Sequence, residues 1–173
     1  MTIPILQTER LILRGHHAED FPAYAAMWSD TDVTRFIGGV PMKEEDAWAK
    51  FLRTIGQWQV LGFGFWAIEE KASGQFIGEV GFVEGKRDIQ PSLKGVPEMG
   101  WAFVPSVHGK GYAQEAVKAA LAWGGTKFGP VAMRCIIAPE NAPSVRLAKK
   151  FGFAEFIRTT YKGNPTVMFE RKA

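Results

Sequence analysis

The chain has 173 residues, of which 46% are hydrophobic and 23% charged, a balance typical of one globular domain spanning residues 1–173. Its net charge of +3 is spread along the sequence without a basic block or an RNA-type aromatic motif, so no nucleic-acid partner is expected. No apolar run approaches the ~18 residues that a membrane span needs, and the N-terminus lacks a basic segment followed by an apolar one, so neither membrane spanning nor secretion is expected. Because the single cysteine excludes an internal disulfide, we expect a cytoplasmic protein.

Apolar residues recur along the chain with two different periods, and these periods predict a series of strands and helices. Their order is β-α-α-β-β-β-α-β-α-β-β, which favours an α/β or α+β domain. Its mixed, mostly antiparallel and twisted sheet should have about seven strands, flanked by helices. The expected strands cover residues 8–14, 64–69, 76–83, 98–104, 131–138, 153–160 and 165–171, and the expected helices begin near Asp20, Lys43, Tyr112 and Asn141.

A few residues predict where these elements begin and end. Asn141 is a suitable helix N-cap, and Gly152 a suitable left-handed C-cap for the same helix. Gly124 and Gly125 are expected to end the preceding helix. The polar stretch Glu84–Val96 is expected to form a mobile loop.

The stretch Glu98–Ala116 combines a strand, a glycine loop and a helix. Pro105 ends the strand, and the loop His108–Gly111 leads into a helix with an apolar stripe. A helix that begins this way gathers free backbone N–H groups and the positive end of its dipole at one point, which suits a phosphate. Glycines let a phosphate approach the backbone closely. The sequence therefore predicts a site for a phosphorylated ligand.

Two common phosphate-binding motifs match this loop poorly. A P-loop requires Ser or Thr after its lysine, but Gly111 follows Lys110. A dinucleotide fingerprint requires a third glycine, but Gln114 stands at that position. Nicotinamide-dinucleotide binding is therefore kept only as a minor alternative.

The stretch resembles instead the Gcn5-related N-acetyltransferase (GNAT) superfamily, whose signature Gln/Arg-x-x-Gly-x-Gly/Ala opens a helix. Gly111 and Ala113 match the signature, while His108 departs from its first position. It is similar in particular to the RimJ/RimL-type branch of ribosomal-protein N-acetyltransferases, which carry a run like EIGYxLxPxxWGKGYATEA. Thr8–Arg14 agrees with that branch's TxRLxLR, and Ala138–Phe153 agrees with its AxxxNxxSxxLxEKxGF, except that Lys149 replaces a glutamate.

This resemblance implies that acetyl-CoA lies where the central strand splays from its neighbour. The amides of Gly109–Ala113 would hold its pyrophosphate without a metal ion, and the backbone of Phe103 and Val104 would pair with the pantetheine arm. The cofactor-binding residues implied are Phe103, Val104, His108, Gly109, Lys110, Gly111, Tyr112, Ala113, Asn141, Ser144 and Lys150.

The resemblance also implies residues for the chemistry. Ser144 would protonate the departing thiolate while Asn141 orients the pantetheine, and Tyr161 is a substitute for Ser144. Asn141 and Ser144 could also have a purely structural role. Asn141 suits a helix N-cap, and Ser144 suits the first turn of the same helix.

The general base is expected to be a carboxylate. Glu98, which opens the central strand, is the first candidate, and Glu79, which interrupts an apolar strand, is the second. Desolvation favours the neutral form of a carboxyl group and so makes it a better base near neutral pH. Either side chain could instead face water, and a water chain could replace a dedicated base. Cys135 alternates with apolar residues and is expected to be a packing residue, not an acyl carrier.

The resulting hypothesis is an acetyl-CoA-dependent N-acetyltransferase that acts on a primary amine by direct attack in a ternary complex. The acceptor could be a peptide N-terminus or a small-molecule amine, bound by the two early helices, the Thr34–Val40 connector and the Glu84–Val96 loop. The alternative is a non-catalytic module of the same fold that binds or senses CoA. The aromatic content would permit a homodimer.

Overall fold

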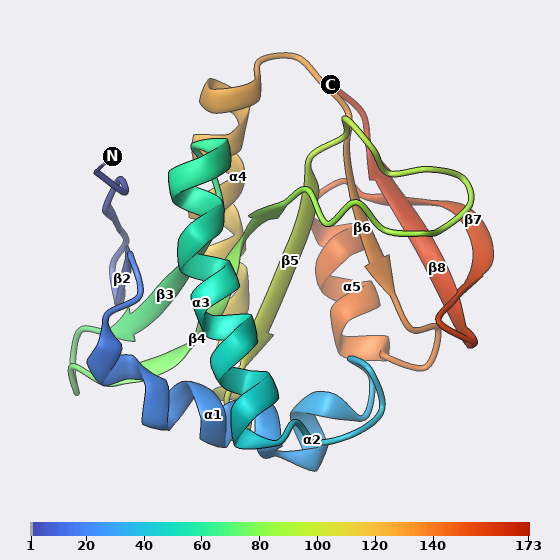
Figure 1. Cartoon of the computed structure of the whole chain (residues 1–173). Helices are drawn as coiled ribbons and strands as arrows, with labels where there is room; N and C mark the ends of the chain where they lie inside the picture. Colours follow the sequence, from blue (N-terminus) through green and yellow to red (C-terminus); the bar gives the residue numbers. More distant parts are fainter. Residues whose placement is uncertain (1) are drawn as a thin grey trace. The chain divides into compact units, whose positions relative to one another are not determined.

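The computed structural model describes residues 2–173 and shows a sheet flanked by helices (Figure 1). The strands are β1 Leu6–Gln7, β2 Leu11–Arg14, β3 Phe65–Glu70, β4 Phe76–Val83, β5 Glu98–Phe103, β6 Met133–Ile137, β7 Ala154–Tyr161 and β8 Asn164–Arg171. The helices are α1 Phe21–Ser29, α2 Thr31–Thr34, α3 Glu44–Leu61, α4 Tyr112–Phe128 and α5 Ala142–Lys150, with short 3-10 turns at Ala18–Asp20 and Pro105–Val107.

The eight strands follow the order β1-β2-β3-β4-β5-β6-β8-β7. β5 and β6 run parallel, with Glu98 opposite Arg134, whereas β1 with β2, β2 with β3, β3 with β4, β6 with β8 and β7 with β8 are antiparallel. The predicted mixed, mostly antiparallel sheet is therefore confirmed.

The sheet has eight strands where about seven were predicted, because the short strand β1 precedes residue 8, and residues 8–10, predicted as part of a strand, form a turn before β2. The Thr8 N–H donates to the Leu11 carbonyl at 3.0 Å, and the Leu11 N–H donates to the Thr8 hydroxyl at 3.0 Å. These two bonds close a turn, so β1 and β2 form a hairpin with Leu6 opposite Leu13. Alternation alone could not show this turn, since it contains neither glycine nor proline.

The chain divides into two compact units, each with its own buried residues. The first contains the chain up to Gly81 together with Trp101–Leu121. In this unit α1 and α3 pack against β3, β4 and the end of β5, and the shared core includes Tyr24, Met27, Trp28, Val33, Phe51, Ala67, Phe76 and Ala102. The acidic first turn predicted for α3 is present, and it suits the positive end of the helix dipole.

The second unit contains Phe82–Gly100 and Ala122–Ala173. Its segment between β4 and β5, expected to be mobile, is anchored instead. Ile89 and Leu93 are buried against Met168, and the Thr159 hydroxyl donates to the Gln90 carbonyl at 2.7 Å. The anchors are apolar residues within a mostly polar segment. The prediction considered only the overall polarity of the segment and therefore missed them.

Helix α4 continues through Gly124 and Gly125, so the predicted end of this helix is wrong. A Cβ on Gly124 would lie 2.6 Å from the ring of Phe82, which shows that close packing requires this glycine. The helix ends four residues later, before Gly129, whose φ is +72°. Other predicted details are confirmed: Asn141 caps α5 and Gly152 has a φ of +83°.

Candidate functional site

The loop between β5 and α4 presents main-chain donors without partners. Gly109 and Gly111 have φ values of +75° and +82°, in the left-handed region that favours glycine. The N–H groups of Gly109, Gly111, Tyr112 and Ala113 donate no hydrogen bond to any residue in the described range 2–173. They precede a helix of 17 residues, so its positive dipole end lies among them. This cradle can hold the oxygens of a diphosphate.

Backbone groups at the end of β5 already have hydrogen-bond partners within the protein, which the resemblance did not imply. The Val104 N–H donates to the Ile77 carbonyl at 3.0 Å, and the Val104 carbonyl accepts from Val107 at 3.2 Å. The Nε2 atom of His108 lies 3.1 Å from the Phe103 carbonyl, which can only accept, so Nε2 carries the proton. The Val104 N–H is therefore already used, while the Phe103 and Val104 carbonyls each keep a second lone pair for a pantetheine arm.

Glu79 lies on β4 and is only 1% exposed, which contradicts the reading that it faces water. The Lys50 ammonium, from α3, donates to Glu79 Oε1 at 2.9 Å and lies 4.2 Å from the centre of the Trp28 ring. On the other side, Nε2 of His16 lies 3.7 Å from Glu79 Oε2. One oxygen of Glu79 is thus bound to a cation, while the other keeps its capacity to accept.

The surroundings of Glu79 contain further polar atoms without hydrogen-bond partners among the described residues. They are both ring nitrogens of His16, the Tyr24 hydroxyl, Trp28 Nε1 and Glu79 Oε2. Burial lowers the pKa of His16, which therefore stays neutral near pH 7. Burial, and then the charge of Glu79, raises the pKa of Tyr24. Thr54 and Trp28 lie close enough to lower the pKa of Tyr24 in part, so Glu79 Oε2 and the His16 ring are the groups that can still bond to a ligand or to water.

Glu98, in the second unit, is 4% exposed and fully engaged by one arginine. Arg87 donates from Nε to Oε2 at 2.7 Å and to Oε1 at 3.0 Å, and from Nη2 to Oε1 at 2.7 Å. Burial disfavours the charge of Arg87, but the hydrogen bonds and charge of Glu98 outweigh it and raise the pKa of the guanidinium. The Tyr161 hydroxyl accepts from Arg87 Nη1 at 3.2 Å. This geometry fixes the carboxylate and occupies both of its oxygens.

Cys135 is buried in β6, as predicted. Burial, assisted by the charge of Glu98, raises the pKa of its thiol. A thiol held neutral is a weak nucleophile, which disfavours an acyl-cysteine intermediate.

Asn141 and Ser144, also in the second unit, lie at the start of α5. The Asn141 Oδ1 atom accepts from the Ser144 N–H at 3.3 Å, so this oxygen serves as a helix cap. Lys150 is exposed in the last turn of the same helix. The amide nitrogen of Asn141 and the hydroxyl of Ser144 are the groups that the resemblance assigns to the cofactor and the thiolate.

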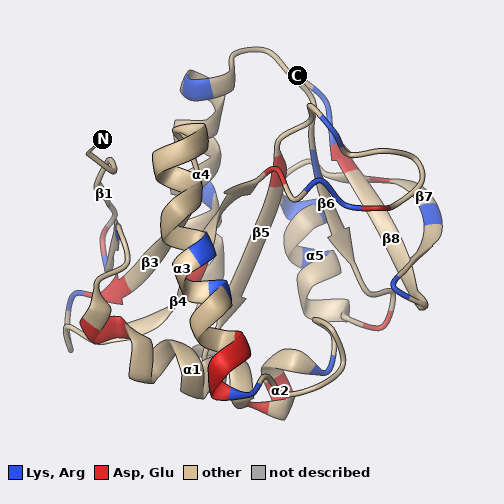
Figure 2. Ribbon diagram, in the orientation of Figure 1, with Lys and Arg blue, Asp and Glu red and all other residues tan. Residues whose placement is uncertain are grey.

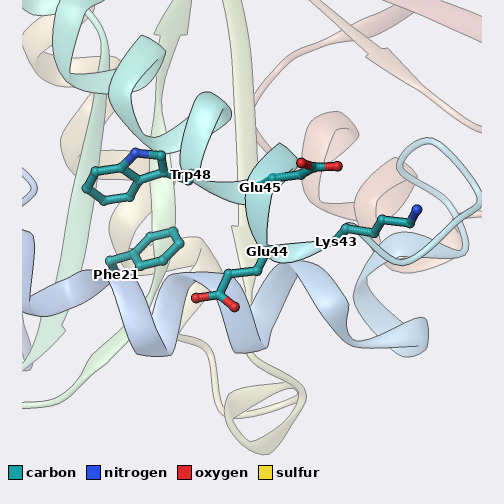
Figure 3. A pocket seen from close by; sticks show the side chains of 5 residues that line it. All are labelled: Phe21, Lys43, Glu44, Glu45 and Trp48. Atoms are coloured by element: carbon teal, nitrogen blue, oxygen red, sulfur yellow. The ribbon is translucent and has the colours of Figure 1, made fainter.

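A surface pocket lies where α3 begins, lined by Phe21, Lys43, Glu44, Glu45 and Trp48. The two rings meet edge to face with 4.7 Å between their centres, and Trp48 is 43% exposed. In Figure 3 the Glu44 carboxylate lies near the Phe21 ring, while Glu45 and Lys43 extend away from it. Figure 2 shows that acidic residues gather at this end of α3. Aromatic faces beside carboxylates suit a cationic ligand.

Sequence reasoning missed Lys50 and Arg87, which bind the two candidate carboxylates, and His16, which lies beside Glu79. For Lys50 a signal existed, because it follows Ala47 by three residues and precedes Thr54 by four, on the buried stripe of α3. No comparable pattern marked His16 or Arg87. Within residues 2–173 no three His, Cys, Asp or Glu side chains are placed to hold a metal ion, and no helix is long and apolar enough to cross a membrane.

The comparison with known proteins identifies the family. A family model described as acetyltransferase (GNAT) domain matches residues 10–154. The chain belongs to the GNAT family. This acetyltransferase is 32% identical over 167 residues to the uncharacterized N-acetyltransferase YnaD of Bacillus subtilis (strain 168), and the match covers 92% of the chain and 89% of YnaD.

The GNAT fold is equally clear in solved structures. A putative GNAT-family acetyltransferase from Bordetella pertussis superposes with a TM-score of 0.86 at 30% identity, covering 98% of this chain and 99% of that one. An acetyl transferase from Salmonella typhimurium, titled as modifying the N-terminal serine of ribosomal protein L7/L12, shares the fold with a TM-score of 0.76 at 15% identity, over 98% and 99% of the two chains. The resemblance drawn from the sequence is therefore confirmed, and the chain is an N-acetyltransferase.

Proposed function

We propose that this GNAT protein transfers the acetyl group of acetyl-CoA directly to a primary amine in a ternary complex. The observation that carries the proposal is the row of unbonded N–H groups at Gly109, Gly111, Tyr112 and Ala113. They open a long helix and provide the charge complement that a diphosphate needs without a metal ion. Acetyl-CoA supplies the activated thioester, and the residues of the chain bind and orient both substrates.

Glu79 is the general base that the geometry favours, ahead of Glu98. Its Oε2 atom has no hydrogen-bond partner among residues 2–173, whereas Arg87 engages both oxygens of Glu98. A free α-amine titrates near ~8 and a lysine amine near ~10.4, so either acceptor must lose a proton before it attacks. Glu79 accepts that proton. The resemblance assigns protonation of the leaving thiolate to the Ser144 hydroxyl, which regains a proton from the second N–H that the amine loses as the amide forms. Backbone N–H groups of β5 stabilise the oxyanion between these steps.

The acceptor amine enters beside the pocket formed by Phe21, Glu44 and Trp48. An ammonium group is attracted by the faces of aromatic rings and by carboxylates, and this pocket offers both. The Salmonella enzyme suggests a peptide α-amine, and a small-molecule amine is the other candidate. We place the reaction in the cytoplasm, and the protein acts there as a monomer or a homodimer.

A thiol-release assay tests this function. The purified chain is incubated with acetyl-CoA and a panel of amines that includes N-terminal peptides of ribosomal proteins and small primary amines. We expect release of free CoA thiol with at least one amine and none without an amine. Binding of CoA, measured by calorimetry, without thiol release for any amine would favour the non-catalytic module.

A further inference from the structure

Arg10, in the turn between β1 and β2, makes a set of contacts that have no role in the reaction proposed above. Its side chain is 41% exposed, but it is held firmly by Glu115 in the first turn of α4. The Glu115 carboxylate accepts from Arg10 Nε at 2.7 Å, from the Arg10 N–H at 2.7 Å and from the Thr8 hydroxyl at 2.5 Å. A charged pair with three such bonds has one well-defined geometry.

From this fixed position the Arg10 guanidinium reaches the glycine loop. Its Nη1 atom donates to the Lys110 carbonyl at 3.0 Å, and its carbon lies 4.3 Å from the centre of the Tyr112 ring. Its Nη2 atom is 3.4 Å from the position that a Cβ on Gly111 would take. One side chain therefore contacts three consecutive residues of the cradle.

The contact with Lys110 has a geometric consequence. In a planar trans peptide the carbonyl and the following N–H point in opposite directions. Because Arg10 binds the Lys110 carbonyl, the N–H of Gly111 points away from Arg10. Gly111 could otherwise rotate freely, since a glycine tolerates many backbone conformations.

One further contact ties the start of α4 to β3. The Tyr112 hydroxyl donates to Glu70 at the end of β3, and Glu70 also accepts from the Ser73 hydroxyl at 2.6 Å. The ring of Tyr112 thus lies against Arg10 while its hydroxyl is tied to β3. The cradle is attached to the sheet through side chains on both sides.

Arg10 also compensates an unfavourable charge. Glu115 places a carboxylate in the turn that should receive a diphosphate, and like charges repel. Burial favours the neutral acid, but the hydrogen bonds from Thr8 and Arg10 outweigh it and lower the pKa of Glu115, so it is ionised at neutral pH. The guanidinium neutralises this charge locally.

We propose that Arg10 is a positioning residue for the cofactor: clamped by Glu115, it holds the Lys110–Gly111 peptide so that the Gly111 N–H faces the diphosphate. The inference rests on the proposed function, and it adds a residue outside the glycine loop to the recognition of the cofactor. It also gives the N-terminal Thr8–Arg14 stretch a role in binding.

The test compares two acetyl donors, acetyl-CoA and S-acetylpantetheine, of which only the first carries a diphosphate. For Arg10→Met we expect KM for acetyl-CoA to rise about tenfold, with kcat within about twofold of wild type and kcat/KM for S-acetylpantetheine unchanged. Arg10→Lys keeps the charge but loses the forked geometry of the guanidinium. Its KM for acetyl-CoA should therefore lie between those of the wild type and Arg10→Met. Glu115→Gln weakens the clamp but also removes a charge that repels the diphosphate, so it should raise KM for acetyl-CoA by less than Arg10→Met and leave kcat/KM for S-acetylpantetheine unchanged. It is the second variant if Arg10→Met does not fold. Arg158→Met is the matched control, since Arg158 forms an ion pair of the same 2.7 Å length with Glu155 on the exposed strand β7.

Two results would overturn the inference in different ways. If the wild-type protein binds acetyl-CoA and the Arg10 variants weaken both donors equally, or neither, the positioning role is wrong while the proposed function stands. If the wild-type protein neither binds nor uses acetyl-CoA, the proposed function is wrong and the inference falls with it.

Discussion

Glu79 and Glu98 are both almost completely buried on strands, yet their carboxylates are bonded in opposite ways. Arg87 supplies three hydrogen bonds to Glu98 and occupies both of its oxygens. Lys50 supplies one hydrogen bond to Glu79, whose second oxygen has only the His16 ring nearby, at 3.7 Å. Burial alone therefore does not identify a general base. The useful criterion is whether the carboxylate keeps a lone pair that can accept a proton.

The comparison predicts that substitutions at the two carboxylate sites, one in each unit, have different effects. A fully bonded buried pair contributes mainly to the stability of the fold when it is intact, and its loss leaves an uncompensated charge. A carboxylate with an open position contributes to the reaction when it is near the substrate. Substitutions should therefore affect unfolding in one unit and turnover in the other.

The largest effect is expected for Arg87→Met. It leaves the buried Glu98 carboxylate without a cation and should lower the free energy of unfolding by ~3–5 kcal/mol, as breaking a buried pair does. Urea denaturation followed by tryptophan fluorescence measures this change. Arg158→Met, at an exposed pair, should leave the midpoint unchanged. A marginal loss of stability together with a large loss of kcat would instead make Glu98 and Arg87 part of the catalytic machinery.

The next largest effect is expected for Glu79→Gln. The amide keeps the shape of the side chain but cannot take a proton, so kcat should fall by about 10²–10³-fold while KM for acetyl-CoA stays the same. Thiol release over a range of both substrates measures it. Glu98→Gln is the matched variant, and its loss of kcat should be under about tenfold once the assay temperature is below its melting range.

Equal losses of kcat in the two variants would remove the distinction between the carboxylates. A larger loss in Glu98→Gln would restore the first choice that the sequence suggested. A rate unchanged by both substitutions would favour a water chain as the proton acceptor.

Much of the fold was predictable because local signals and packing agree. Periods in the apolar residues located most strands and helices, and Asn141 and Gly152 mark the ends of α5. Prediction failed where a tertiary contact overrides a local preference. Gly124 remains inside α4 because Phe82 leaves no room for a side chain, and no local rule contains that information.

The candidate site was predictable only in its backbone part. The sequence predicted a glycine loop that lets a phosphate approach the backbone, and the structure adds that Gly109 and Gly111 both have positive φ. The pairing of each carboxylate with its cation was not predictable: Lys50 lies on the buried stripe of α3, but no local pattern shows which carboxylate it meets, and none marks Arg87 as the partner of Glu98. Lys50 is 29 residues from Glu79, and the preference for Glu98 over Glu79 depended on not knowing that Arg87 binds Glu98.

The smallest effect concerns His16, the neutral neighbour of Glu79. Burial lowers its pKa, although the charges of Glu79 and Asp20 oppose this and those of Lys50 and Arg14 reinforce it. Because the unfolded chain binds this proton more tightly, the stability that His16 contributes is present above the ordinary value near 6.5. It is lost as pH falls from there toward the lowered pKa of the folded state, by at most ~1.4 kcal/mol per pH unit.

Urea midpoints between about pH 7 and 5 should therefore fall for the wild-type protein and fall less for His16→Gln, whose side chain does not titrate. His17→Gln, at the exposed neighbouring position, should keep the wild-type slope. If His16→Gln does not fold, a titration of the His16 ring by NMR gives the same answer, since a midpoint below the ordinary value near 6.5 is required. A midpoint above 7 would mean that His16 is protonated beside Glu79. Glu79 would then lie between two cations, and the difference between the two carboxylates would largely disappear.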